Sequence, residues 1–346
     1  MKFLGMMILA VFSTTTVSTF AQDVVTDPTA SLTATQLAAL NSLPTHRGAP
    51  NPRLETVRSE SQCVTATMKA TMTTPSMAVD TWVVVVPKVP SFDAQEVLEQ
   101  TTSMETMEIV DQSPMRRPLL RSKVQVNSPI QPSTSSFETT IKVQLFSRTL
   151  RPRSRRSAPV EDLAPTQRTQ YLLPDRFFDY DSANFQQWKQ QHGFQRERRE
   201  SEVEFAQRVF RAIATDYRYM FEYGQDRTAS HLCKLNETDC GGLSILFTTV
   251  MRSEAIPART LVGRFAESAG PSPTSAGDRN ERYHVIAEFF ASGIGWIPVD
   301  GASAVLHDAQ QRATLSIESL LRVCRRWFVA PSITGTQATN SITSLR

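Results

Sequence analysis

The stretch Asp239–Arg259, which reads DCGGLSILFTTVMRSEAIPAR, decides the fold of this chain. Its large apolar residues recur at helical spacing (i, i+3, i+4, i+7) and predict a buried helix from about Gly241 to Glu254: Leu243, Leu246, Phe247 and Val250. Proline disfavours the helical conformation in the residue before it, so Ile256-Pro257 ends this helix. Cys240 therefore stands at the N-terminus of a buried helix.

Cys240 is the candidate nucleophile of this stretch. A thiol at a helix N-terminus faces the positive end of the helix dipole, which favours the thiolate, the nucleophilic form. Gly241 and Gly242 follow it, and they are expected to leave the backbone open so that a substrate carbonyl can approach closely. The alternative is a small buried core cysteine, which is the commonest role of a free cysteine.

Two strand-like runs lie downstream, Tyr283–Phe290 and Gly295–Asp300, joined by a short turn that contains Ser292. A hairpin centred near Ser292 would place His284 and Asp300 directly opposite each other, with their Cβ atoms about 4.5–5.5 Å apart. The carboxylate would then fix the tautomer of the imidazole and stabilise its protonated form. The alternative is an ordinary hydrogen-bonded strand pair, but a thiol at a helix N-terminus in the same domain favours nucleophilic catalysis.

Together these segments resemble the transglutaminase-like superfamily. The stretch Asp239–Arg259 is similar to its core motif, in which a catalytic cysteine opens a helix that ends in a Gly-Ile-Pro-Ala-Arg type of turn. The runs His284–Glu288 and Gly295–Asp300 resemble the motifs that carry the family's histidine and aspartate, and their order and spacing agree. Ser253-Glu254-Ala255 replaces the family's usual small turn. The resemblance covers about residues 200–305 and implies a papain-like core.

The resemblance also implies the roles of the candidate catalytic residues. Cys240 would attack a carboxamide or peptide carbonyl and form a thioester, and His284 would act first as the base and then as the acid for the leaving amine. Asp300 would orient His284. The backbone N–H of Cys240 is the expected first oxyanion donor, and a hydroxyl of Tyr217 or Tyr219 is a candidate for the second. The alternative for both tyrosines is packing.

The chain is accordingly expected to be a cysteine peptidase or amidase that acts on a peptide, a protein or an amide like those of peptidoglycan stems. A catalytically silent peptide-binding module with a papain-like cleft is the first alternative, and a protein cross-linking acyltransferase is the second. The sequence leaves open whether water or an amine accepts the acyl group, and it leaves the oligomeric state open.

The N-terminus predicts export. Lys2 is followed by an apolar run, Phe3–Phe12, and small residues at Thr19 and Ala21 fit a cleavage site after Ala21. Residues 1–21 are therefore expected to be a signal peptide and the mature chain to be periplasmic or extracellular. A transmembrane anchor is the alternative, but the apolar run is only about half of the ~20 residues that a span needs, so no stable membrane insertion is expected.

The remaining sequence predicts several further segments. Residues 22–60 are expected to be a flexible leader with a short helix near 31–43, and residues 336–346 a flexible tail. Alternating runs in 61–150 predict a small antiparallel β-domain of the sandwich type. An exposed Arg/Pro/Ser-rich linker is expected at 151–170, and the transglutaminase-like domain at 171–335. In that domain helices precede strands, which predicts an α+β fold, and Ser201-Glu-Val-Glu204 predicts a capped helix start.

Composition limits the class of protein. The chain has 346 residues, of which 40% are hydrophobic and 21% charged, as in ordinary soluble globular proteins of about two domains. Its net charge of +3 is too small to indicate a nucleic-acid partner. No metal or cofactor is expected, because neither a CxxC pair nor a Cys/His cluster at metal spacing occurs. If Cys240 stays free, at most one disulfide can form among the other cysteines: Cys63, Cys233 and Cys324.

Overall fold

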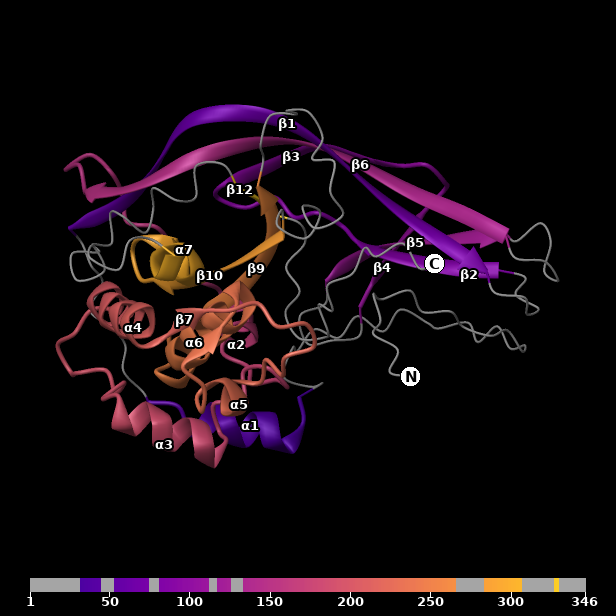
Figure 1. Cartoon of the computed structure of the whole chain (residues 1–346). Coiled ribbons are helices and arrows are strands. Elements are labelled where there is room, and N and C mark those ends of the chain that lie inside the picture. The colour runs from indigo at the N-terminus through magenta and orange to yellow at the C-terminus, as the bar shows by residue number, and fades with distance from the viewer. Residues whose placement is uncertain are drawn as a thin grey trace.

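The computed structural model describes residues 32–44, 53–74, 81–111, 117–125, 133–265, 283–306 and 327–329. The predicted signal peptide and tail lie outside these residues, as does Cys324. Figure 1 shows a strand-rich region that runs along one side of a core of helices and a sheet. This is an α+β fold in which strands precede the core, as predicted.

Two antiparallel sheets form the described part of the strand-rich region. The first consists, in spatial order, of β1 (Leu54–Thr74), β6 (Ser133–Pro152) and β3 (Gln95–Thr102). The second consists of β2 (Thr81–Pro87), β5 (Pro118–Gln125) and β4 (Met107–Val110).

Strand β6 shows why this region forms sheets. Every second residue from Phe137 to Leu145 is buried and the residues between them are at least partly exposed, which is the period of a strand with one covered face. Phe137 packs against Val84 of β2 and Val124 of β5, so the two sheets share a small apolar cluster.

The strands extend beyond the predicted boundaries. Strand β1 begins at Leu54, inside the segment expected to be a flexible leader, because its first residues pair with the end of β6. Strand β6 continues to Pro152, inside the segment expected to be a linker. Strands β3 and β4 were missed, since β3 reads QEVLEQTT without apolar alternation and β4 is very short.

The expected linker is also attached to the core. Arg153 donates hydrogen bonds to the carbonyls of Leu54 and Gly293, and the N–H of Val160 donates to the same Gly293 carbonyl at 3.0 Å. Ser292 donates to Asp162 at 2.8 Å. Most side chains of residues 151–164 are exposed, but the Arg153 and Asp162 side chains and the Val160 backbone hold the tip of the β10–β11 hairpin. The last residues of the expected linker, Pro165–Gln170, form a helix instead.

The core consists of helices packed on one antiparallel sheet. The sheet, in spatial order, contains β11 (Gly295–Val299), β10 (Tyr283–Ala291), β9 (Ala258–Phe265) and β12 (Trp327–Val329). A short parallel pair lies nearby, β7 (Arg218–Tyr219) and β8 (Glu237–Thr238). The described helices are α1 (Ala34–Asn41), α2 (Pro165–Gln170), α3 (Ala183–Gln191), α4 (Glu202–Asp216), α5 (Ala229–Leu232), α6 (Cys240–Ser253) and α7 (Gly301–Leu306).

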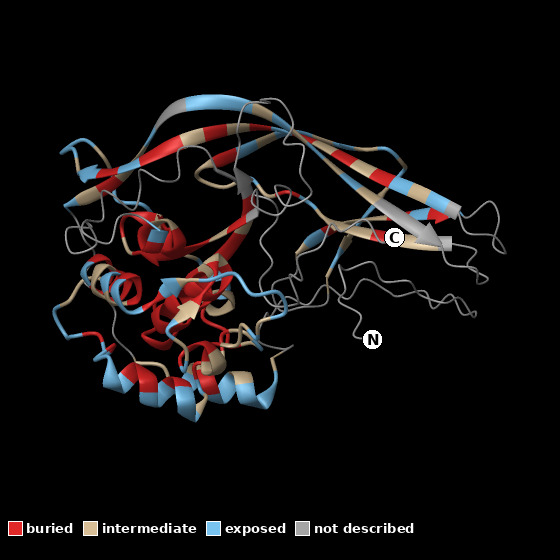
Figure 2. Cartoon of the chain, viewed as in Figure 1, coloured by how far each residue is buried: buried red, intermediate tan, exposed pale blue. Residues whose placement is uncertain are grey.

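Helix α6 is the centre of the core. All of its residues after Cys240 are buried, and it packs on β9 and β10 (Figure 2). The capping box predicted for α4 is present, with Ser201 and Glu204 bonded reciprocally. The predicted apolar stripe of α4 is buried against the same core: Val203, Ala206, Phe210 and Ile213.

Arg148 of β6 joins the strand-rich region to the core. Its side chain is 2% exposed, and its Nη1 atom lies 3.7 Å from a carboxylate oxygen of Glu288 on β10. It also donates to the carbonyl of Trp296 on β11 and pairs with Asp93 at 3.3 Å. Arg259 approaches Glu288 at 2.7 Å. The β10–β11 hairpin is therefore fixed by charges from both parts of the chain.

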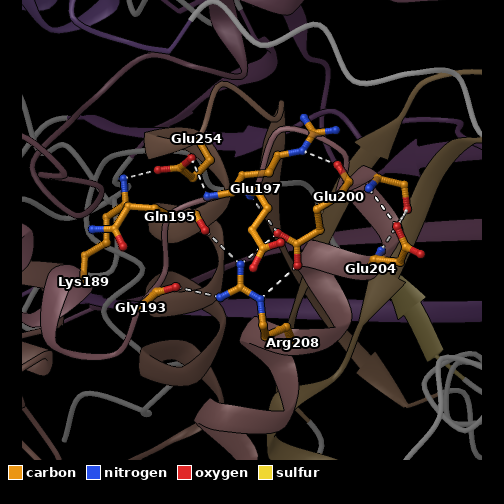
Figure 3. A network of polar contacts seen from close by, with 10 residues as sticks. Lys189, Gly193, Gln195, Glu197, Glu200, Glu204, Arg208 and Glu254 are labelled. Carbon is orange, nitrogen blue, oxygen red and sulfur yellow. Dashed lines mark hydrogen bonds and ion pairs between the residues drawn. The ribbon is translucent and has the colours of Figure 1, made fainter.

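The end of α6 explains the departure from the family's small turn. Ala255 has a φ of 57°, a left-handed conformation that glycine adopts more easily. The preceding Glu254 is buried, pairs with Lys189 and accepts the N–H of Arg196 at 3.0 Å (Figure 3). In the same network, Arg208 binds Glu200 and nearby carbonyls. The buried ion pair holds the turn in place although it lacks glycine.

Ala255→Val is expected to lower the free energy of unfolding by about 2–3 kcal/mol, because a β-branched side chain tolerates a positive φ poorly. Ala255→Gly is expected to change it by less than about 1 kcal/mol. Chemical denaturation of both variants measures the difference. Ala212→Val, at a half-buried site within α4, is the control for adding the same two carbons. Equal losses at the two positions would contradict the backbone argument.

Candidate active site

Helix α6 begins at Cys240, one residue before the predicted start, so the thiol stands at its first position. Asp239 is the N-cap, and its side chain accepts the N–H of Gly242 at 3.0 Å. Cys240 follows it, is half-exposed and has a free thiol. The thiol therefore lies at the positive end of a buried helix, where a negative charge is stabilised. Cys63 and Cys233 also carry free thiols.

The two glycines after Cys240 have a different purpose from the one expected. A Cβ atom on Gly242 would lie 2.0 Å from the hydroxyl of Thr238. A Cβ atom on Gly241 would lie 3.2 Å from a carboxylate oxygen of Asp239 and 3.3 Å from the Arg227 side chain. Gly242 is required because the Thr238 side chain packs against it, and the Asp239 and Arg227 side chains leave little room for a Cβ atom on Gly241, so the expected open space is absent on the Cβ side of both glycines.

The hydrogen bond predicted between His284 and Asp300 is present. The Nε2 atom of His284, on β10, lies 2.8 Å from Oδ2 of Asp300, just after β11, and both side chains are buried. The imidazole of His284 is also hydrogen-bonded to the thiol of Cys240. Because Nε2 is bonded to Asp300, Nδ1 is the ring nitrogen available to the thiol. The structure thus brings the three predicted residues together in one chain of contacts.

The predicted register of the hairpin was nevertheless wrong. Ala287 pairs with Val299 and Ala291 with Gly295, so the hairpin is centred on Gly293 and Asp300 lies diagonally from His284. The turn consists of residues 292–294, and Gly293 at its centre and Gly295 just after it have positive φ values. The pairing shifts by two residues, which keeps both side chains on one face of the sheet, because that face repeats every second residue. The diagonal neighbours remain within reach of each other.

The electrostatics of the site favour a charged imidazole. Burial opposes the charge, but hydrogen bonds to Asp300 and Cys240 and the attraction of their negative forms raise the pKa of His284 to about 10. Burial likewise opposes the charge of Asp300, yet the hydrogen bond to His284 and those from Ser303 hold the pKa of that carboxyl below its usual value. The N–H and hydroxyl of Ser303 donate at 2.9 and 2.7 Å, which fixes the carboxylate at the start of α7.

The two candidate tyrosines lie in different places. Tyr217 is buried and donates its hydroxyl hydrogen bond to the carbonyl of Leu232 at 3.2 Å, so it belongs to the core. Tyr219, on β7, interacts with both the thiol and the backbone N–H of Cys240. Burial and then the negative charges of Cys240 and Asp239 raise the pKa of its hydroxyl, so the hydroxyl keeps its proton. Tyr219 is the one available as a hydrogen-bond donor at the thiol.

Sequence reasoning missed two polar residues at the site. Ser303 stands three positions after Asp300 and holds its carboxylate, and an aspartate followed by a serine at capping distance was the available signal. Arg227 lies in the segment between β7 and α5 and pairs with Asp239. It has no motif or periodicity around it that could have identified it.

Neither a metal site nor a membrane-spanning helix is found in the part of the chain that the structure describes. No three side chains of His, Cys, Asp or Glu come together there in a way that could hold a metal ion. No described helix is long and apolar enough to cross a bilayer.

Comparison with protein families assigns the core. Residues 190–301 match the model of the transglutaminase-like superfamily. This range contains α4, α6, the β9–β11 sheet and the Cys240, His284 and Asp300 side chains. Residues 190–301 therefore form a transglutaminase-like domain.

A solved structure has the same type of fold. A protein from Cytophaga hutchinsonii, which its name describes as a candidate cysteine protease, is similar with a TM-score of 0.50 and 16% identity, over 72% of this chain and 80% of that one. The periplasmic domain of TgpA from Pseudomonas aeruginosa has a TM-score of 0.39 and 15% identity, over 81% of this chain and 80% of its own. No curated protein matches the sequence. At such low identity, the first likeness establishes the fold alone.

Proposed function

We propose that the protein is an exported cysteine amidase or peptidase that acts through a thioester on Cys240. The observation that carries the proposal is the position of His284, whose imidazole is bonded to Asp300 and interacts with the thiol of Cys240. This arrangement joins an activated nucleophile, a base within hydrogen-bonding reach and a group that orients the base, which together make up a nucleophilic catalytic site.

The first half of the reaction forms the thioester. The resting site is a thiolate–imidazolium pair in which His284 already holds the proton of Cys240, and the thiolate sulfur attacks the carbonyl carbon of the amide. The oxyanion that forms would be stabilised by the backbone N–H of Cys240 and the hydroxyl of Tyr219, which lie side by side. When the C–N bond breaks, His284 returns its proton to the leaving amine.

The second half releases the acyl group. His284, now neutral, takes a proton from water, and the hydroxide oxygen attacks the thioester carbonyl. The C–S bond then breaks, the carboxylic acid leaves, and the proton on His284 re-forms the imidazolium beside the Cys240 thiolate. Asp300 holds the ring in the orientation that both halves need. No metal or cofactor enters either half.

The substrate is proposed to be an amide in a peptide, a protein or a peptidoglycan stem. The proposed site of action, the periplasm or the extracellular space, rests on the signal peptide predicted for residues 1–21. An amide in such a substrate offers the planar carbonyl that a thiolate attacks. The proposal includes no nucleic acid partner and no stable insertion into a membrane.

Release of amine from a panel of amides tests the proposal. The panel contains unrelated peptides, a glutamine-rich protein and peptidoglycan stem fragments, each assayed in buffer and with added primary amine. Hydrolysis in buffer that needs Cys240 supports the proposal. Transfer to the amine without hydrolysis would assign a cross-linking acyltransferase instead. If no amide reacts and iodoacetamide labels Cys240 no faster than a cysteine in an unfolded chain, the protein is a silent binding module.

A further inference from the structure

A buried carboxylate lies directly beside the proposed nucleophile. Asp239 precedes Cys240 in the chain, is 2% exposed and caps α6 through its Oδ1 atom. A full negative charge at this place would repel a thiolate on the next residue and would offset the positive end of the helix dipole. The site therefore needs a cation that neutralises Asp239 if Cys240 is to work as a thiolate.

Arg227 supplies that cation. Its Nε atom lies 3.1 and 3.2 Å from the two carboxylate oxygens of Asp239, and its Nη2 atom lies 2.5 Å from Oδ2. The contact is largely enclosed, with 19% of the Arg227 side chain and 3% of the Asp239 side chain exposed. A forked, charge-assisted contact of this kind is among the stronger ones in proteins, and enclosure reduces its screening by solvent.

The guanidinium of Arg227 is itself held in place. It donates to the carbonyls of Gln225 and Glu222 at 3.3 and 3.5 Å. The side chain of Gln225 in turn accepts the hydroxyl of Thr238 at 2.7 Å. The Arg227 side chain also packs against Gly241, where its Cδ atom would lie 3.3 Å from an added Cβ atom. Arg227 thus ties the segment after β7 to the cap of α6, and its charge cannot easily move away from Asp239.

The other charged groups around the thiol do not neutralise Asp239. His284 on β10 and Tyr219 on β7 interact with the thiol, and Asp300 is engaged by His284. The neighbouring α7 carries no titratable side chain. On β8, the carboxylate of Glu237 lies 3.8 Å from Arg218 at the surface. The site thus contains two buried carboxylates, and the imidazolium of His284 can stabilise a thiolate only if the charge of Asp239 is balanced separately.

We infer that Arg227 is a positioning residue whose charge neutralises Asp239, so that the Cys240 thiolate and the His284 imidazolium persist at neutral pH. The inference deepens the proposed function and rests on it. Arg227 does not touch the reacting atoms. It acts through the N-cap, and its removal would leave the thiolate of Cys240 next to an unbalanced charge.

A charge-cancelling pair of substitutions tests this role. Arg227→Met removes the cation, and Asp239→Asn removes the anion but keeps the cap, since asparagine caps helices as well as aspartate does. The rate at which iodoacetamide labels Cys240 is followed by mass spectrometry from about pH 5 to pH 9 in wild type, both single variants and the double variant. Arg218→Met, which removes an exposed arginine nearby, is the control.

Arg227→Met is expected to move the midpoint of the labelling curve upward by about one pH unit, which lowers the rate about tenfold below the midpoint. The double variant is expected to regain the wild-type curve, and Arg218→Met is expected not to change it. A double variant as slow as Arg227→Met would overturn the inference, because Arg227 would then act only by holding the segment 222–225. A wild-type curve in Arg227→Met would overturn it as well.

The same curves separate this inference from the proposed function. If wild-type Cys240 is labelled quickly at low pH and the variants behave as expected, the inference stands even when no amide in the panel is cleaved, and only the proposed function fails. If wild-type Cys240 is labelled no faster than a cysteine in an unfolded chain, there is no thiolate to support and both fail.

Discussion

Cys240→Ala is expected to abolish amide turnover on every substrate that the wild-type protein accepts, with a loss of about 10⁴-fold or more. The substitution removes the nucleophile, and no neighbouring group can form the same thioester. Cys240 is half-exposed at the first position of α6, so the loss of its sulfur is expected to change the free energy of unfolding by less than about 1 kcal/mol. Turnover and melting temperature of the purified variant measure the two effects separately.

Cys233→Ala is the matched control for Cys240→Ala. This second free thiol is buried in the main core and lies 3.4 Å from the carbonyl of Ser230. Its removal leaves a small cavity and is expected to lower the free energy of unfolding by about 1–2 kcal/mol while turnover per folded molecule stays unchanged. If Cys240→Ala retained turnover, or if the two variants showed the reverse pattern, Cys240 would be a core cysteine and the proposed chemistry would be wrong.

Local sequence patterns predicted most of the core because each pattern has a direct physical cause. The helical spacing of apolar residues in 239–259 predicted α6, which is buried throughout. The Ser201–Glu204 capping box predicted the start of α4 within one residue. The hydrogen bond between His284 and Asp300 was also predicted, although the predicted register was wrong by two residues. A shift of two residues keeps each side chain on the same face of the sheet, so the two side chains still meet.

The features that the sequence did not predict depend on contacts between distant segments. Strand β3 has no alternating pattern of its own and exists because β6 pairs with it. Arg148 contacts the distant β10–β11 hairpin as well as Asp93 and Thr56, and its burial depends on these contacts. Arg227 could not be identified, since an arginine in a polar segment has no pattern that distinguishes a surface side chain from one that neutralises a buried cap. For the same reason, the sequence suggested that Gly241 leaves space for a substrate, whereas in the structure the Arg227 side chain packs against it.

His284→Ala is expected to lower the labelling of Cys240 by iodoacetamide about 10²-fold at pH 6 and much less at pH 9. The pKa of His284 is raised to about 10, so its positive charge is present from acidic pH up to about that value. Over this range the imidazolium stabilises a neighbouring thiolate, whereas an isolated cysteine with a pKa near 8.5 is less than about 1% ionised at pH 6. The difference between the two proteins should therefore close as the pH rises.

The same linkage predicts how stability depends on pH. A group whose folded-state pKa is raised stabilises the fold fully below its unfolded value of 6.5, and this contribution disappears as the pH rises through about 10. The stability advantage of wild type over His284→Ala should decrease in that direction, as denaturation at several pH values can show.

Asp300→Asn, which removes the orienting charge but leaves the imidazole, should slow labelling less than His284→Ala does. Labelling curves that coincide for wild type and His284→Ala would exclude the thiolate–imidazolium pair, because His284 supplies the positive charge of that pair.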